Sequence, residues 1–142
     1  MNSTSHLTLA FVAASLLTAY AAATAETSPA GGKKLPAGVF DVEWNGLAAA
    51  LRTDVAPGKF VEWCAELPAG ERVAWRFDSP APLNFNVHYH EGKDVHFPAR
   101  IDAVKAANDV LQAPVKQDYC WMWTNKSGAP VPLDAQLRKE AR

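Results

Sequence analysis

The sequence lacks the motifs that mark the common classes of enzyme. It has no GxSxG nucleophile turn, no HExxH zinc motif, no phosphate-binding P-loop and no dinucleotide fingerprint. Its two cysteines are not spaced as CxxC, which argues against a zinc ribbon and a thioredoxin-like redox centre. Acidic and basic residues are interspersed and sum to a net charge of −1, with no basic stripe for nucleic acid. We therefore expect a protein that is not an enzyme and has no nucleic-acid partner.

The N-terminal region has the pattern of an export signal. Residues 7–22 are apolar or small and uncharged, and Ala23-Thr24-Ala25 forms a small-x-small cleavage pattern. This run is shorter than the roughly 20 residues that span a bilayer and has no basic flank, although an uncleaved anchor is the alternative. We expect a signal peptide at 1–25 and a flexible leader at 26–37. The exported protein, periplasmic or secreted, would then keep no stable membrane span.

The remaining residues, 38–142, are enough for one domain with a hydrophobic core. Short alternating runs separated by Gly, Pro and Asn turns predict an all-β fold, an antiparallel β-sandwich. Asp102–Leu111 has a helix-favouring composition and is expected to form one short helix or an ordered loop. Pro80 and Pro82 are expected to interrupt a strand, because proline cannot donate to a sheet ladder. The expected strands are 39–44, 59–66, 72–78, 83–90, 116–124 and 131–137.

The two cysteines, Cys64 and Cys120, both follow the signal. An exported protein with an even number of cysteines is expected to pair them, with buried free thiols or a thiolate metal site as alternatives. If Cys120 points into the core, Trp121 and Trp123 lie on the opposite face of their strand. Exposed tryptophans there would mark a contact surface, whereas burial under a loop or second layer is the alternative.

Three of the four histidines lie in a predicted hairpin at 83–97. Alternation places Asn84, Asn86, His88 and His90 on one face of its first strand. Imidazoles at i and i+2 on a strand lie about 7 Å apart at Cα and can bind copper or zinc. A three-residue loop at 91–93 would add His96 to this face, whereas a two-residue loop at 92–93 would place it on the other.

Two groups of residues are therefore candidates for function. Amide and aromatic side chains suit a small ligand, such as a sugar or peptide, or a protein partner. A solvated polar face that binds nothing is the alternative. The candidate ligand or metal site, with copper or zinc as the metal, is His88, His90 and His96, and the candidate contact surface is Asn84, Asn86, Trp121, Met122 and Trp123.

Several short motifs occur together along this region: Cys64, Pro68-x-Gly70, Leu83-x-Phe85-x-Val87, Gly92-Lys93 and the run 119–125. Together they resemble the GOLD-like β-sandwich of the lumenal domains of secretory-pathway cargo receptors, over residues 61–137. The resemblance implies a sandwich stapled by a Cys64–Cys120 disulfide and a non-enzymatic binding role. The receptors' coiled coil, second membrane span and cytoplasmic tail have no counterpart here, so cargo-receptor function is not expected.

The sequence thus predicts an exported binding protein with the histidine hairpin as its site. A periplasmic copper- or zinc-binding protein is one alternative. A structural accessory subunit of an envelope complex is the other.

Overall fold

Seven strands make up the part of the chain that the computed structural model describes, residues 38–141. The predicted signal peptide and leader lie outside these residues. Within this range we find no helix, and so none that would cross a membrane. The strands are β1 Val39–Asp41, β2 Ala48–Val55, β3 Phe60–Leu67, β4 Arg72–Glu91, β5 Asp94–Gln112, β6 Gln117–Thr124 and β7 Val131–Lys139.

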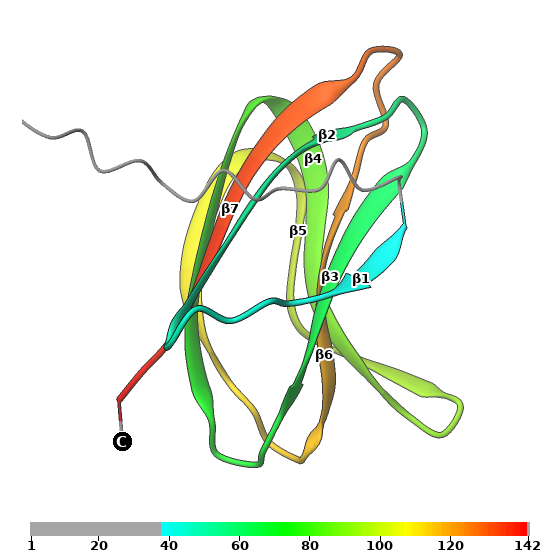
Figure 1. The fold of residues 1–142 in the computed structure, drawn as a ribbon. Helices are drawn as coiled ribbons and strands as arrows, with labels where there is room; N and C mark the ends of the chain where they lie inside the picture. The colour runs from blue at the N-terminus through cyan, green and yellow to red at the C-terminus, as the bar shows by residue number, and fades with distance from the viewer. Residues whose placement is uncertain (1–37, 142) are drawn as a thin grey trace, which may run out of the picture. The chain divides into compact units, whose positions relative to one another are not determined.

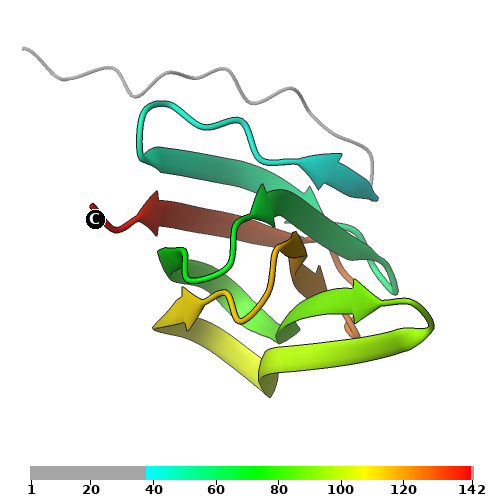
Figure 2. The same ribbon diagram turned by 90° about the horizontal axis from the view of Figure 1, so that it is seen from below.

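The long strand β4 organises the sheet. The strand order is β1-β3-β6-β4-β7-β2, and β5 runs beside β4 outside this path. The first part of β4, residues 73–78, pairs with β7, whereas residues 84–89 pair with β6. The sheet therefore curls into a half-barrel as β4 passes from one neighbour to the other (Figures 1 and 2). The predicted all-β class is confirmed, but the predicted antiparallel sandwich is wrong. All seven strands belong to one curled sheet, which is mixed because β1 pairs with β3 in parallel.

The expected helix at Asp102–Leu111 is wrong, because these residues belong to β5. Pairing with β4 along most of its length overrides the local preference of an alanine-rich segment. The expectation that a strand ends at Pro80 and Pro82 is also wrong, because β4 continues through both prolines. The β4–β5 register shifts between Asp78 and Leu83, so these prolines lie where the ladder is irregular and a missing N–H is tolerated.

The core lies on the concave side of the curled sheet. Alternate residues of β3, β4, β6 and β7 are buried there, as expected for strands with one face on a core. Four aromatic rings, those of Trp75, Phe77, Phe85 and Trp123, contact one another with centroids 4.7 to 5.7 Å apart. They come from both parts of β4 and from β6, so they join the two halves of the curled sheet.

Candidate functional site

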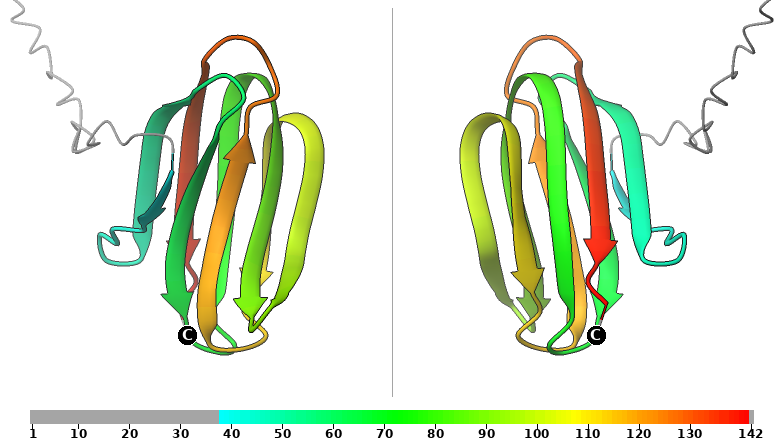
Figure 3. Two further views of the ribbon diagram at one scale, coloured as in Figure 1. Left: turned by 90° about the vertical axis from the view of Figure 1, so that its right-hand side faces the viewer. Right: turned by 90° about the vertical axis from the view of Figure 1, so that its left-hand side faces the viewer.

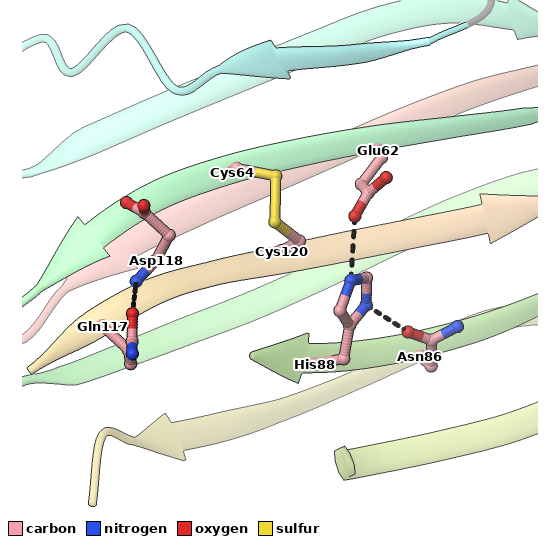
Figure 4. The surroundings of a disulfide bond; sticks show 7 residues. All are labelled: Glu62, Cys64, Asn86, His88, Gln117, Asp118 and Cys120. Carbon is pink, nitrogen blue, oxygen red and sulfur yellow. Dashed lines mark hydrogen bonds and ion pairs between the residues drawn. A yellow bond between two sulfur atoms is a disulfide. The ribbon is translucent and has the colours of Figure 1, made fainter. Parts of the chain in front are cut away.

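The disulfide lies on the face of the sheet that points away from the core. Cys64 of β3 is directly opposite Cys120 of β6, and the two are joined with Cα atoms 4.1 Å apart (Figure 4). The predicted disulfide is confirmed. Its neighbours along β6, Trp121 and Trp123, point the other way and are fully buried. The cysteine side chains therefore point away from the core, whereas the tryptophan side chains point into it.

His88 of β4 is the most constrained polar side chain on this outer face. It is buried, its Nε2 lies 2.8 Å from Glu62 Oε1, and its Nδ1 lies 2.8 Å from Asn86 Oδ1 (Figure 4). A carboxylate can only accept, so the Nε2–H group donates to Glu62. Burial lowers the pKa of His88; Glu62 opposes this shift, and His90 adds to it. Two acceptors around the ring favour the imidazolium, but the cost of desolvating that charge is the larger effect.

The three histidines of the hairpin do not converge. Tyr89 pairs with His96, and His90 pairs with Val95, so the turn is the two-residue Gly92-Lys93 loop. Gly92 has a φ of 62°, which suits the first position of such a turn. This register places His96 on the opposite face, where its ring stacks on Tyr89 with a centroid distance of 4.8 Å. The site predicted from three histidines is therefore reduced to His88 and His90, whose rings are 5.3 Å apart.

Most of the predicted polar row is occupied by contacts within the chain. Asn84 Oδ1 accepts from the N–H of Ala103, 3.1 Å away, at the point where β5 bends with a φ of 53° at that alanine. Asn86 is held by His88, as described above. Of the four residues in this row, only His90 is exposed.

The candidate contact surface of Asn84, Asn86, Trp121, Met122 and Trp123 does not form a single surface. Trp121 and Trp123 lie in the core, with exposed fractions of 0% and 1%. Met122 and the two asparagines are on the outer face and half-buried. Alternation alone could not resolve this, because Trp121 and Trp123 lie on one face of β6 while Cys120 and Met122 give the other face apolar residues too.

Metal donors come together at one place among residues 38–141. The only group of three acidic, cysteine or histidine side chains close enough to share an ion there is Glu62, Cys64 and Cys120, with donor atoms within 4.8 Å of one another. The two sulfur atoms are bonded to each other, so they are not free to act as ligands in this state. Sequence reasoning missed Glu62, although it has the same alternation phase as Cys64 on β3.

The end of the β4–β5 hairpin exposes apolar side chains near this face. β6 pairs with β4 only as far as Tyr89, and beyond that residue β4 and β5 pair with each other alone. Figure 1 shows this hairpin diverging from the other strands, and the left view of Figure 3 shows β3, β6 and β4 side by side. Val95 and Phe97 are 42% and 48% exposed, and the Arg100 guanidinium lies over the Phe97 ring at 5.6 Å.

A second feature lies on the other outer face, over β2, β7 and the first part of β4. It is a shallow hollow of about 250 Å³. Arg52 pairs with Asp134 at 2.8 Å. All the residues that line the hollow are polar or charged, so the hollow offers no apolar platform for a ligand. The lining residues are Arg52, Arg76, Asp78, Asp134 and Gln136.

Comparison with known proteins identifies the fold but no family. No protein-family model matches the chain, and no curated protein matches it by sequence. Among solved structures, it is similar to Aeromonas hydrophila PliG, a periplasmic inhibitor of g-type lysozyme (14% identity, TM-score 0.56, 72% of this chain and 96% of that one). Salmonella Typhimurium PliG is similar at 10% identity, with a TM-score of 0.53, 72% of this chain and 97% of that one. The Yersinia pseudotuberculosis-derived mitogen matches at 12% identity, with a TM-score of 0.52, 67% of this chain and 87% of that one.

These similarities overturn the expected resemblance to GOLD domains. The fold is that of the PliG and mitogen half-barrels. The motifs behind the earlier expectation were two cysteines, a glycine turn and alternating apolar residues. Any small β-fold with a cross-strand disulfide can carry them, so they do not distinguish one such fold from another.

Proposed function

We propose that this chain is an exported, non-enzymatic binding protein, periplasmic or secreted, whose partner is another protein. The observation that carries the proposal is the hairpin tip, residues 90–97. There, two apolar side chains are exposed on a hairpin that pairs only with itself. The disulfide supports an extracytoplasmic location, because such bonds persist in oxidising compartments.

The hairpin tip has the composition of a small binding surface. Val95 and Phe97 have the same alternation phase, and His90 pairs directly with Val95. Arg100 covers one side of the Phe97 ring. An apolar centre with polar groups at its rim is the usual arrangement of a protein interface, and aromatic and arginine side chains often contribute most to its affinity.

The structural neighbours suggest which partner to test first. Both PliG proteins are described as inhibitors of g-type lysozyme, and the third protein is described as a mitogen. A fold shared at this level of identity does not carry a partner with it. A g-type lysozyme is therefore the first partner for a direct assay, within the wider proposal of a protein partner.

The test measures binding of the purified exported protein to a g-type lysozyme by interferometry, together with inhibition of cell-wall lysis. Replacing Val95 and Phe97 by serine removes the apolar side chains from the tip, and we expect affinity to fall at least about tenfold. Val110→Ser is the matched control, because Val110 is an exposed valine in the other half of β5.

Two results would contradict this assignment of the site. In the first, the double variant binds as the wild type does. In the second, Arg76→Ala in the polar hollow abolishes binding while the tip variant keeps it, which would move the site to the other outer face. If the lysozyme does not bind at all, the same three variants can be compared on partners captured from the extracytoplasmic fraction.

A further inference from the structure

The surroundings of the disulfide contain more potential metal donors than a structural cross-link needs. Asp41, Cys64, Cys120 and His88 are consecutive partners across β1, β3, β6 and β4. Glu62 precedes Cys64 by two residues and therefore points to the same face. Figure 4 shows Glu62, His88 and the two sulfur atoms on one side of the sheet.

Three of these donors lie as close together as the ligands of a single ion, and the fourth, His88, contacts one of them. One carboxylate oxygen of Glu62 and the sulfur atoms of Cys64 and Cys120 all lie within 4.8 Å of one another. His88 Nε2 is 2.8 Å from Glu62 Oε1. In a tetrahedral zinc site, bonds of about 2.0 to 2.3 Å place neighbouring donor atoms about 3.3 to 3.8 Å apart. Opening the disulfide and turning the His88 ring toward the two sulfur atoms would bring the four donors to these separations.

His88 already has the hydrogen-bond partner that a metal-bound histidine needs on its other ring nitrogen, Nδ1. A metal-bound histidine usually donates its other N–H to a carbonyl or carboxylate oxygen, which sets the tautomer and the ring orientation. His88 Nδ1 lies 2.8 Å from Asn86 Oδ1, which can accept that hydrogen bond. With the proton on Nδ1, Nε2 no longer carries the hydrogen that it now donates to Glu62, and it offers a lone pair to an ion placed between the two side chains.

We propose that reduction of the Cys64–Cys120 disulfide converts this cluster into a Zn²⁺ site formed by Cys64, Cys120, Glu62 and His88. A dithiol supplies the two electrons and two protons, and is itself oxidised to a disulfide while both cysteines become thiols. Zn²⁺ then displaces the two thiol protons as the thiolates bind it. In the oxidised protein the sulfur atoms are bonded to each other, so the site exists only after reduction.

The sheet keeps the two cysteines adjacent when the bond is broken. β3 and β6 pair without interruption from Phe60↔Thr124 to Leu67↔Gln117. On the reverse side of these strands, Trp63 and Trp121 are buried in the core. The two sulfur positions therefore depend on the ladder and the core as well as on the disulfide.

The test uses Co²⁺ as a spectroscopic substitute for Zn²⁺. The protein is reduced with dithiothreitol, freed of reductant under nitrogen and titrated with Co²⁺, and Zn²⁺ is then added as a competitor. We expect one Co²⁺ per reduced chain with thiolate-to-cobalt absorption, and no such absorption from the oxidised protein. Glu62→Gln and His88→Gln should each weaken binding at least about tenfold. The matched controls, Glu66→Gln on β3 and His90→Gln on β4, should not.

Three results would overturn the proposal. The first is the absence of stoichiometric Co²⁺ binding after reduction. The second is binding that persists in Cys64→Ser/Cys120→Ser, or that does not change in Glu62→Gln and His88→Gln. The third is a reduced protein that has lost the near-UV circular dichroism of its buried tryptophans and does not regain it with Co²⁺. None of these results depends on the hairpin tip, so they leave the proposed protein-binding function untouched.

Discussion

Asn125 provides the sharpest test of how the end of the sheet is held. Its side chain is fully buried just after β6 and makes four hydrogen bonds. The amide nitrogen donates to the carbonyl oxygens of Val55 at 2.8 Å and Ala129 at 2.7 Å. The amide oxygen accepts from the N–H and hydroxyl groups of Ser127 at 2.8 and 2.7 Å. One side chain thus ties the end of β2 to the β6–β7 loop.

Replacing Asn125 with alanine should lower the free energy of unfolding by about 3 kcal/mol. The largest part comes from the bond to the Val55 carbonyl, which lies on a fully buried residue and contributes about 1.5 kcal/mol. The other three bonds have partners nearer to water, so each contributes roughly 0.5 kcal/mol. Asn125→Asp should be at least as destabilising, because it places a carboxylate oxygen against the two carbonyl oxygens that the amide nitrogen now contacts.

The assay is equilibrium urea unfolding followed by tryptophan fluorescence, with thermal unfolding as a second measurement. For a domain of this size, the alanine variant should unfold roughly 10 to 20 °C below the wild type. Asn108→Ala is the control, because Asn108 is exposed on β5, and surface changes usually stay within about 0.5 kcal/mol. If Asn125→Ala loses less than about 1 kcal/mol, the hydrogen-bond reasoning is refuted.

Three further predictions concern the hairpin and the disulfide. Replacing both Cys64 and Cys120 with alanine should lower the unfolding free energy by about 4 kcal/mol on the chain-entropy model, given their separation of 56 residues; an unchanged urea midpoint would contradict this. Because burial lowers the pKa of His88, the unfolded chain takes up a proton there at a higher pH, so stability should fall as the pH drops below about 6.5. His88→Gln should flatten this fall, and His90→Gln tests whether removing any histidine from β4 does the same. Gly92→Ala should strain the turn by about 1 to 2 kcal/mol and speed amide exchange at the hairpin tip, since Gly92 has a φ of 62°; unchanged exchange would argue against a strained turn.

Much of the fold could be predicted from local patterns. Clean alternation in 72–78 and 83–90 placed these residues in strands correctly, and glycine and proline marked most of the turns. The failures came where pairing with a distant strand outweighed local preference. Asp102–Leu111 is rich in alanine, yet it forms part of β5 because β4 provides a ladder along most of its length. Pro80 and Pro82 interrupt that ladder without ending β4, because the sheet bends there.

The candidate site was predictable only in part. Histidine clustering drew attention to the hairpin at 83–97, and the two-residue turn was one of two registers considered. Neither pattern shows that His88 reaches across β6 to Glu62, because that contact joins residues 26 positions apart on strands that are not neighbours. The exposed Val95 and Phe97 look in sequence like ordinary strand residues. Their exposure follows from the end of the β6 pairing at Tyr89.

The sequence by itself predicted the β class, the hairpin and the pairing of Cys64 with Cys120, because these follow from alternation, turn chemistry and an even cysteine count in a chain with the pattern of an export signal. Only the tertiary structure decided which face of β6 is buried. Each face of this strand carries apolar residues, Trp121 and Trp123 on one and Cys120 and Met122 on the other, so alternation alone does not choose between them. Packing places Trp123 against Phe77 and Phe85 and buries Trp121 in the same core, and thereby turns the disulfide outward beside His88 and Glu62.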